Sequence, residues 1–596
     1  MATKAGDDLV ARLSEWGVTT IYGYPGDGIN GILAALRRSG DKPRFVQTRH
    51  EEMASFMACA HAKFTGEVGV CMATSGPGAI HLLNGLYDAK LDHQPVVAIV
   101  GQTYASVIGG DQQQEVDLLS LFKDVASAYV QQVNVPSAMH HCIDRALRIA
   151  AAERTVTAVI VPADVQDMKA AAQPQTIKSV HTGIGFVHDR GLPPDSELQR
   201  AADVLNAGRK VAMLVGAGAL DATDEVLAVA DTLGAGIAKA LLGKAAVPDD
   251  IPYCTNSIGL LGTKPSWDMM QDADTLFVVG SSFPYANFLP PLGQARGVQV
   301  DRSARMLSLR YPMEVCLLGD SAATLRELLP LLHRNEDRSF QETIVKKMAD
   351  WWRLMDDRAQ PEDRDGRIRP QALFAAISRH LPDNAIIGSD SGSAANWFAR
   401  HVRIRRGMKA SLSGNLATML PGMPYPIAAK FAFPDRVAVG TIGDGAMQMG
   451  GMGELLTAAK YYRTWSDPRM VVLVLNNEDL NQVTWEQRVM EGDVRFEASQ
   501  RIPYVPFHEY ARLIGLGSAK VERADQIEDA VVAAFNADRP FVIDAMTDPE
   551  EPPLPPHITF QQAEDYTKSF LKSPSGELAG MVNAMREKID EFVPGR

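Results

Sequence analysis

Hydrophobic positions in the first part of the chain follow two different spacings. Leu9, Val10 and Leu13 recur every three or four residues, as on one face of a helix, whereas short apolar runs such as "PVVAIVG" are typical of buried strands. A further helix is predicted from about Glu51 to Phe64, directly after the run "RFVQTR". Strands that alternate with helices in this way predict a parallel sheet with crossover helices.

The same alternation returns twice along the chain. It lapses around residues 169–190, resumes with "KVAMLVGAGAL", "DTLFVVGSSF" and "GVQVD", and returns after a charged helical stretch at 333–368 with "AIIGSD", "RVAVGTIGDG", "MVVLVLNN" and "FVIDAM". We therefore expect an α/β protein with three doubly wound parallel-sheet domains. Their predicted ranges are 1–170, 190–335 and 365–550, and a proline-rich, then helical tail covers 551–596.

Length and composition narrow the class of protein. A chain of 596 residues exceeds what one hydrophobic core supports, and its 46% hydrophobic and 22% charged residues are ordinary for a globular protein. No apolar run reaches the roughly 18 residues that span a bilayer. The start lacks a secretory pattern and the five cysteines show no paired spacing, so we expect a cytoplasmic protein. A net charge of −13 without acidic blocks argues against a nucleic-acid partner.

The segment "TIGDGAMQMGGMG" places Asp444 where a strand passes into a helix, between Gly443 and Gly445. Ligands of parallel sheets lie beyond the carboxyl ends of the strands, and the free N–H groups of a helix start favour phosphate. An aspartate that merely caps the helix is a common alternative. The next strand ends about thirty residues later in Asn476 and Asn477, whose amide oxygens also suit a hard cation. A carboxylate, an amide and a backbone carbonyl, completed by two diphosphate oxygens and a water, would give Mg²⁺ its octahedron.

Gly-Asp-Gly followed by Asn-Asn at this spacing resembles the binding motif of thiamine-diphosphate (ThDP) enzymes. By that resemblance Asp444, Asn477 and the carbonyl of Asp479 are the Mg²⁺ ligands. The resemblance covers essentially the whole chain, in the order pyrimidine domain, central domain and diphosphate domain. The other cofactor contacts that it implies in the two outer domains are Pro25, Gly26, Gly392, Ser393, Gly443, Gly445 and Ala446.

The segment "FVQTRHEEMASFM" resembles the family's pyrimidine-binding domain, and Glu51 matches the glutamate that bonds the aminopyrimidine ring. A carboxyl group there drives the ring to the imino form that takes the proton from the thiazolium carbon. Glu52 is the alternative, and two acids in the first turn of a helix are also a common surface feature. Met419 matches the bulky residue that holds the cofactor bent, although Leu420 and Pro421 depart from the usual pattern.

The chain is most similar to the group of pyruvate oxidase, quinone-linked pyruvate dehydrogenase and acetolactate synthase, which keep a flavin in the central domain. Glycine turns at strand ends suit a pyrophosphate, and acids there suit a ribose hydroxyl, although such turns are frequent in α/β domains. Phe283 to Tyr285 look more like the pyruvate-oxidising enzymes than the synthases. The implied FAD contacts are Gly216, Gly218, Gly262, Thr263, Ser282, Phe283, Asp301 and Asp320.

Two departures from this group concern the substrate pocket. Gln113 and Gln482 stand where the group usually has phenylalanines, and buried amides need hydrogen-bonding partners. A substrate with an extra hydroxyl or carbonyl group would supply one. Gln114 and Glu486 match residues that lie near the substrate carboxylate in the group.

The resemblance implies decarboxylation of a small 2-oxo acid, pyruvate or a relative, with electrons passing through FAD to a quinone or oxygen. An acetolactate synthase-like carboligase with structural FAD and a non-catalytic homologue are the alternatives. It also implies a homo-oligomer, a dimer or tetramer, in which Glu51 of one chain meets Asp444 of another. The tail resembles the last segment of the quinone-linked enzymes, and Leu578, Met581 and Val582 share a helical face, so peripheral membrane contact is one hypothesis and packing on its own protein the other.

Overall fold

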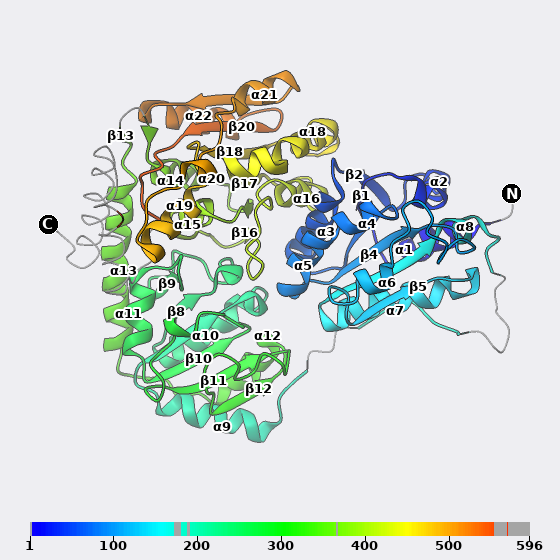
Figure 1. Cartoon of the computed structure of the whole chain (residues 1–596). Coiled ribbons are helices and arrows are strands. Elements are labelled where there is room, and N and C mark those ends of the chain that lie inside the picture. Colours follow the sequence, from blue (N-terminus) through cyan, green and yellow to red (C-terminus); the bar gives the residue numbers. More distant parts are fainter. Residues whose placement is uncertain (1–2, 172–179, 188–190, 365–366, 554–568, 570–596) are drawn as a thin grey trace. The chain divides into compact units, whose positions relative to one another are not determined.

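A computed structural model describes residues 3–171, 180–187, 191–364, 367–553 and Ser569. It contains three six-stranded sheets and a two-stranded ribbon of β13 (Asp363–Arg364) and β14 (Arg367–Ile368). Figure 1 draws the helices and strands in colours that follow the sequence. The chain divides into two compact units. Unit 1 comprises Met1–His188, Ser413–Gly440 and Met449–Met470, and unit 2 comprises Asp189–Leu412, Thr441–Gln448 and Val471–Arg596.

The first sheet lies in unit 1 and has the strand order β2-β1-β3-β4-β6-β5, with all neighbours parallel. Every residue of β4 and β6 is buried, as expected for strands covered by helices on both faces. The strands are β1 (Thr20–Gly23), β2 (Arg44–Gln47), β3 (Gly69–Ala73), β4 (Val96–Gln102), β5 (Tyr129–Gln132) and β6 (Val156–Pro162). The principal helices are α1 (Ala5–Glu15), α2 (Asn30–Arg38), α3 (Glu51–Thr65), α4 (Pro77–His81), α5 (Leu83–Leu91), α6 (Leu118–Leu121), α7 (Met139–Glu153) and α8 (Ala163–Asp167).

Helix α3 is the central helix of unit 1. The side chain of His50 caps its start by accepting the N–H of Glu52, and Gly66 ends it in the left-handed conformation at φ 80°. Twelve of its fifteen residues are buried, so it is apolar nearly all round, which is the pattern of a helix enclosed by its neighbours. It packs on α5 and on α16 (Pro424–Ala432).

A buried ionic network joins α3 and α5 to the segment 413–425, all within unit 1. The Lys63 ammonium lies 2.7 Å from the Asp92 carboxylate, 3.5 Å from Asp88 and 2.7 Å from the Tyr425 hydroxyl, which in turn donates to Asp88. Asp92 also accepts the backbone N–H groups of residues 414 and 415 at 2.8 Å. Burial lowers the pKa of Lys63, but the attraction of the two aspartates outweighs it and raises the pKa overall. The network therefore fixes the start of this segment against the helices of the first sheet.

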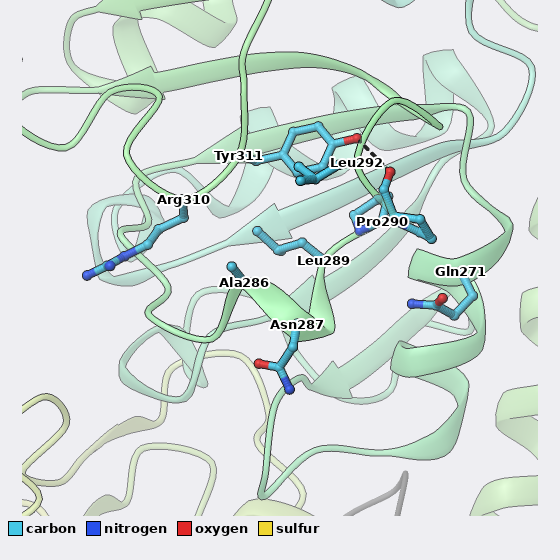
Figure 2. A pocket seen from close by; sticks show the side chains of 9 residues that line it. Gln271, Ala286, Asn287, Leu289, Pro290, Leu292, Arg310 and Tyr311 are labelled. Atoms are coloured by element: carbon cyan, nitrogen blue, oxygen red, sulfur yellow. Dashed lines mark hydrogen bonds between the residues drawn. The ribbon is translucent and has the colours of Figure 1, made fainter. Parts of the chain in front are cut away.

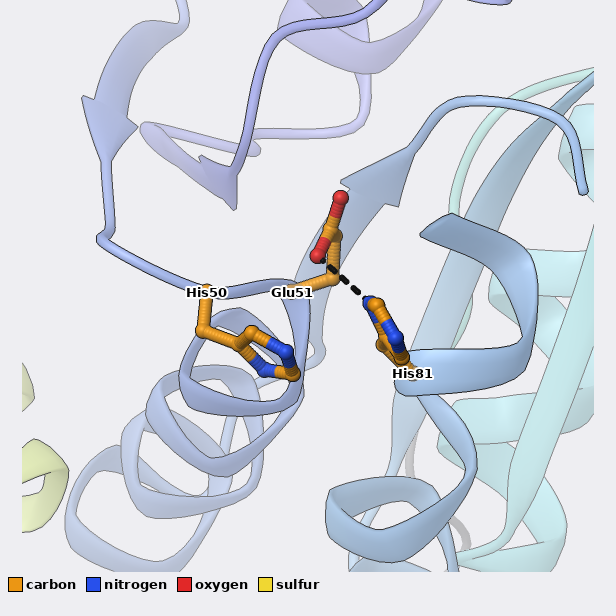
Figure 3. A group of neighbouring side chains, drawn as sticks. All are labelled: His50, Glu51 and His81. Carbon is orange, nitrogen blue, oxygen red and sulfur yellow. Dashed lines mark hydrogen bonds and ion pairs between the residues drawn. The ribbon is translucent and has the colours of Figure 1, made fainter. Parts of the chain in front are cut away.

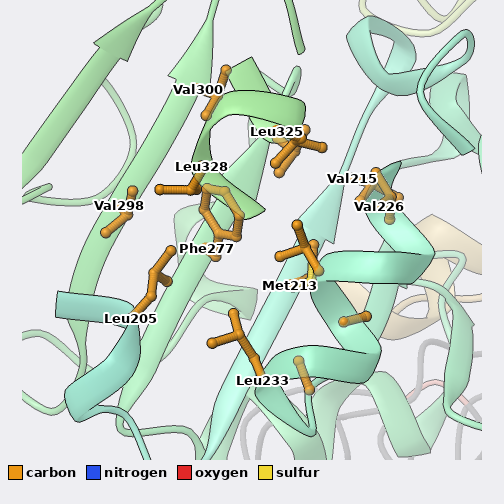
Figure 4. Packing of buried hydrophobic residues seen from close by; sticks show 14 of the residues in the cluster. Leu205, Met213, Val215, Val226, Leu233, Phe277, Val298, Val300, Leu325 and Leu328 are labelled. Atoms are coloured by element: carbon orange, nitrogen blue, oxygen red, sulfur yellow. The ribbon is translucent and has the colours of Figure 1, made fainter. Parts of the chain in front are cut away.

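The second sheet lies in unit 2 and has the order β12-β11-β10-β7-β8-β9. If the six strands are numbered 1 to 6 in chain order and read from β9, the order is 3-2-1-4-5-6, which is typical of dinucleotide-binding folds. The order reverses between β7 and β10. Buried Val, Leu and Phe side chains fill the space between these strands and their helices (Figure 4). The strands are β7 (Val211–Val215), β8 (Gly236–Lys239), β9 (Cys254–Ser257), β10 (Thr275–Val279), β11 (Arg296–Asp301) and β12 (Val315–Leu318). The helices are α9 (Asp195–Ala207), α10 (Thr223–Leu233), α11 (Lys264–Asp272), α12 (Ser321–Leu328) and α13 (Ser339–Arg358).

The third sheet has the order β16-β15-β17-β18-β20-β19, which repeats the order of the first sheet. Its strands are β15 (Ile386–Ser389), β16 (Lys409–Ser411), β17 (Ala438–Gly443), β18 (Met470–Asn476), β19 (Gly517–Val521) and β20 (Phe541–Met546). Its helices include α14 (Pro370–His380), α15 (Ser393–His401), α17 (Asp444–Ala446), α19 (Asn481–Glu486), α20 (Glu497–Gln500), α21 (Phe507–Leu513) and α22 (Ile527–Phe535). Helix α18 (Met452–Tyr461) belongs to unit 1.

The predicted fold class is confirmed, since three parallel α/β sheets follow one another along the chain. Within the described part of the chain, no helix is long and apolar enough to cross a membrane. The tail helix predicted around Leu578 lies outside the described residues.

Candidate active site

The end of β17 presents Asp444 as the first residue of α17, and its side chain is buried. Gly443 caps this helix at φ −79°, so its conformation does not require glycine. A Cβ added at Gly443 would meet no protein atom within 4 Å. The strand end therefore leaves open space beside the buried carboxylate.

The loop after β18 wraps around this carboxylate. Asp444 Oδ2 accepts the backbone N–H groups of Asn477 at 2.8 Å and Glu478 at 2.7 Å, and Oδ1 accepts that of Gly445 at 2.9 Å. Glu478 lies in the left-handed region at φ 59°, which turns the chain so that both N–H groups point at the acid. Burial raises the pKa of Asp444 to about 7, although the three backbone hydrogen bonds lower it. The nearby Asp479 carboxylate also raises the pKa.

This donor set fits a hard divalent cation. Asp444 and Asn477, two predicted ligands, meet at adjacent strand ends, and the amide oxygen of Asn477 already accepts the Asp479 N–H at 3.1 Å. Asp479 is buried and its carboxylate is bonded to Thr484 Oγ1 at 2.9 Å, which leaves its carbonyl as the predicted ligand. A cation beside Asp444 would stabilise the ionised carboxylate that burial disfavours.

The end of β15 lies at the same edge of the sheet. The N–H of Asp390 donates to the carbonyl of Thr441 at 2.8 Å, which places the start of α15 next to the end of β17. Gly392 has φ 74° and ψ −152°, a conformation that only glycine adopts readily, and Ser393 begins the helix. Ala446 is buried beneath this edge. The structure thus brings Gly392 and Ser393 to the edge that carries Asp444.

In unit 1, Glu51 is the first residue of α3 and its side chain is almost buried. Its Oε2 lies 3.0 Å from Nδ1 of His81, at the end of α4 (Figure 3). The ring of His50 lies beside that of His81, with centroids 4.4 Å apart and the planes tilted by 32°. An imidazole on one side and the start of a helix on the other both stabilise a carboxylate here. Glu52 points to a different partner, the Asn84 amide, at 2.6 Å.

The ligand atoms of His50, Glu51 and His81 all lie within 4.8 Å of one another. Sequence reasoning missed both histidines. The segment "GPGAIH" offered a signal for His81, because it places a histidine one turn into a helix that begins at a glycine turn after β3.

Other residues predicted for the pyrimidine side lie at the ends of β1 and β3. A Cβ at Gly26 would lie 2.5 Å from Thr74, so the loop that begins with Pro25 can pack there only with glycine. Gln114 has φ 63° and accepts a hydrogen bond from Ser75 Oγ at 3.0 Å. Gln113 is exposed. The structure thus brings Gln114, but not Gln113, to the β3 turn.

Met419 lies in a strained part of the segment 413–425. Ala417 has φ 53° and Leu420 has φ 95°, and positive φ at a bulky residue is uncommon. The N–H of Thr418 donates to Ser413 Oγ at 3.2 Å, and the ionic network of Lys63 holds the start of the segment. Strain of this kind gathers at functional sites, and the role of Met419 stays a prediction.

A second buried acid of unit 1 supports the turn before Glu51. Glu454, on α18, accepts the N–H of Arg49 at 2.8 Å, and its other oxygen is buried. Burial raises the pKa of Glu454 to about 7. Nothing in the sequence pattern had singled this residue out.

The residues predicted for a flavin gather around β7 and β10, where the strand order reverses. A Cβ at Gly216 would lie 2.4 Å from the carbonyl oxygen of Gly280, and one at Gly218 would lie 2.7 Å from its Cα. The two loops therefore need glycine for their own packing. Ser282 and Phe283 continue from Gly280, and the ring of Phe283 meets that of Tyr285 edge-on at 5.6 Å.

The remaining flavin residues have local roles. Gly262 packs on the carbonyl of Ser257, and Thr263 caps α11 through the N–H of Ser266 at 3.1 Å. Asp301 accepts the N–H of Ser303 at 2.8 Å, and Asp320 caps α12. The strand order, more than these residues, is what fits a dinucleotide.

A separate surface pocket of about 420 Å³ opens beside η5 (Ala286–Phe288) in the second sheet's domain. Figure 2 shows Leu289, Pro290, Leu292 and Tyr311 around it, with Arg310 pointing outward. No residue predicted for the active site lines it.

Comparison with known proteins agrees with this geometry. The fold defines an α/β protein with three six-stranded parallel sheets, and the buried Asp444 marks a candidate cofactor site at the edge of the third sheet. Three family models match consecutive parts of the chain: the N-terminal binding domain of thiamine pyrophosphate enzymes at residues 3–121, their central domain at 198–328 and their C-terminal binding domain at 390–545. The chain belongs to the thiamine pyrophosphate enzyme family.

Its relatives include both oxidising and synthesising enzymes. The "Putative thiamine pyrophosphate-containing protein YdaP" of Bacillus subtilis is 35% identical over 96% of each chain. Pyruvate oxidase of Lactiplantibacillus plantarum is 30% identical over 77% of this chain and 75% of its own. The large subunit of acetolactate synthase isozyme 2 of Escherichia coli is 30% identical over 92% of this chain and 97% of its own. The chain is a thiamine pyrophosphate-dependent enzyme of the pyruvate oxidase and acetolactate synthase family.

Proposed function

We propose that the enzyme decarboxylates a small 2-oxo acid, pyruvate or a relative, with ThDP and Mg²⁺, and passes two electrons through FAD to a quinone or oxygen. The observation that carries the proposal is the buried Asp444 carboxylate, held by the loop of Asn477 beside open space at the sheet edge. When bound, the cofactor supplies a carbon nucleophile and an electron sink for the decarboxylation.

The chain's own residues have distinct roles in this proposal. Asp444, Asn477 and the Asp479 carbonyl would hold the metal, and the glycines at 392, 443 and 445 would allow the diphosphate to approach the backbone. Glu51, whose carboxylate is 3.0 Å from His81, would move the proton on the pyrimidine ring. Met419 would press on the cofactor from its strained segment.

FAD is proposed for the central domain because the sheet has the dinucleotide-binding strand order and its reversal point carries Gly216, Gly218 and Ser282. The domain division into 1–170, 190–335 and 365–550 belongs to the same proposal, as does a homodimer or homotetramer. Quinone as acceptor and membrane contact through the tail concern residues outside the described part of the chain.

The decisive experiment mixes the purified enzyme with pyruvate in the absence of oxygen and follows the flavin absorbance. Bleaching at the rate of CO₂ release is the expected result, because an oxidising enzyme must place the electrons on the flavin. Acetolactate formed over an unbleached flavin would contradict it and establish the carboligase alternative, which the synthase relative favours. Calorimetry with ThDP and Mg²⁺ tests the non-catalytic alternative, since a degenerate homologue would not bind both.

A further inference from the structure

Two helices at the carboxyl edge of the third sheet are joined by a chain of side chains, all within unit 2. Asn396 on α15 donates from Nδ2 to Gln482 Oε1 on α19 at 3.0 Å, and Gln482 Nε2 donates to Glu486 Oε1 at 3.0 Å. Asn396 is buried, Gln482 is half-buried and Glu486 is exposed. The chain therefore runs from the protein interior to the surface along the edge that carries Asp444.

The direction of these hydrogen bonds follows from chemistry. An ionised Glu486 only accepts, so the Gln482 amide must turn its NH₂ group toward it and its oxygen toward Asn396. Asn396 must then donate, and its Nδ2 also donates to the carbonyl oxygen of Gly392 at 3.4 Å. Its own oxygen, Oδ1, is left buried and accepts no hydrogen bond from any residue in the described ranges.

The three hydrogen-bonded side chains consequently have more acceptors than donors. Asn396 Oδ1, the second lone pair of Gln482 Oε1 and the Glu486 carboxylate all accept, whereas one N–H of Gln482 is the donor that remains. A ligand that brings an O–H donor complements this chain. A methyl group leaves the acceptors unpaired, and a second carboxylate meets the charge of Glu486.

These three side chains lie next to Gly392, a predicted cofactor contact. A Cβ placed on Gly392 would lie 3.8 Å from Gln482 Cβ, so Gln482 covers the turn where α15 begins. The alternative is that the three residues only tie α15 to α19. That role would affect stability, but it would not distinguish one substrate from another.

We propose that Asn396, Gln482 and Glu486 determine substrate specificity and select a 2-oxo acid with a hydroxyl group on the carbon beside its carbonyl. Plain alkyl acids and dicarboxylic acids are disfavoured. This inference rests on the proposed function, because it assigns the substrate class of the same site.

Glycerate and lactate test the inference without turnover. They differ in one hydroxyl group, and neither has the 2-oxo group that decarboxylation requires. Calorimetry on the enzyme loaded with Mg²⁺ and ThDP should show glycerate binding at least about tenfold more tightly than lactate, because a site built to bond a hydroxyl rejects the analogue without it. In Gln482→Leu the ratio should fall to about one. Glu491→Gln is the matched control, because it removes a charge from an exposed residue that is not one of the three hydrogen-bonded side chains. It should keep the wild-type ratio.

The same preference should appear in kcat/KM for hydroxypyruvate over pyruvate. Equal affinities for glycerate and lactate in the wild type, or an unchanged ratio in Gln482→Leu, would overturn the inference. A lower melting temperature of Gln482→Leu with its ratio kept would show that the chain only joins the two helices. Release of CO₂ from either 2-oxo acid is scored separately, so the proposed function and the inference can each fail alone.

Discussion

The first and third sheets have the same strand order but carry different chemistry at corresponding places. In the first sheet the loop after β2 leads to Glu51, and in the third sheet the loop after β16 contains Met419. In the first sheet β3 is followed by uncharged Thr74 and Ser75, and in the third sheet β17 is followed by the buried Asp444. The scaffold thus fixes where side chains emerge, and the loops decide what they can do.

The electrostatic surroundings of the two acids differ as well. Asp444 is surrounded by backbone N–H groups with Asp479 nearby, and burial raises its pKa to about 7. Glu51 has the His81 imidazole at 3.0 Å. One sheet therefore offers a place for a cation, and the other offers a carboxylate already paired with a group that can carry a proton.

If this division is correct, Glu51→Gln should have the largest effect. Exchange of the thiazolium proton of bound ThDP, measured by NMR, should slow by about 10²–10⁴-fold, the usual contribution of a positioned acid or base. Cofactor affinity should stay near the wild-type value. Glu52→Gln is the matched control, because it removes a neighbouring carboxylate that bonds Asn84 instead. A larger loss in Glu52→Gln would transfer the role to that residue.

The ionic network of unit 1 should be the most costly to break in terms of stability. Lys63→Met leaves Asp88 and Asp92 buried without their cation, and such losses destabilise by about 3–5 kcal/mol. Chemical denaturation measures the effect. Lys90→Met, which removes an ion pair with the exposed Asp124, should cost no more than about 1 kcal/mol. Similar losses for both variants would show that the buried pair has no special weight.

Asp444→Asn tests the cation side of the comparison. Calorimetric affinity for ThDP with Mg²⁺ should fall by at least about 100-fold, the upper range for removing even an outer partner of a metal ligand. The fold should persist, since asparagine can still accept the N–H groups of residues 477 and 478. Asp538→Asn changes an exposed acid and should bind normally. Unchanged affinity in Asp444→Asn would move the metal elsewhere.

Glu454→Gln should give the smallest effect, visible as a change in pH dependence. Burial raises the folded-state pKa of Glu454 from 4.5 to about 7, so the folded protein binds this proton more tightly than the unfolded chain. The contribution of Glu454 to stability is therefore fully present below pH 4.5 and is lost as the pH rises through about 7, by an amount on the order of 1–3 kcal/mol. Melting temperatures between pH 5 and pH 8 should decline less in Glu454→Gln. Glu67→Gln, an exposed control, should follow the wild type, and parallel curves for Glu454→Gln would refute the assignment.

The sequence predicted the long buried strands well, because β4 and β18 are covered on both faces and appear as continuous apolar runs. It could not predict short edge strands such as β5 and β19, which mix polar and apolar residues and are mostly half-buried, or β16, which is only three residues long. Pairing with a neighbouring strand, not local composition, makes them strands.

A similar limit applies to the site. The meeting of Asp444 with Asn477 was predictable, since both follow buried strands whose carboxyl ends share one edge. The pairs of Glu51 with His81 and of Gln482 with Asn396 were not, because they depend on how two helices are rotated about their own axes. The glycines at 216 and 218 were predicted for a flavin, and the structure adds a packing role for both.

The network around Lys63 also bears on how the protein can be dissected. A fragment that stops at residue 188 would lack Tyr425 and the backbone groups of residues 414 and 415, so two interior carboxylates would lose partners that only the distant segment provides. The amino-terminal third of the gene product is therefore not expected to behave as an autonomous module when expressed by itself. Co-expression with a second polypeptide that spans residues 413–470 is the arrangement in which it should become soluble.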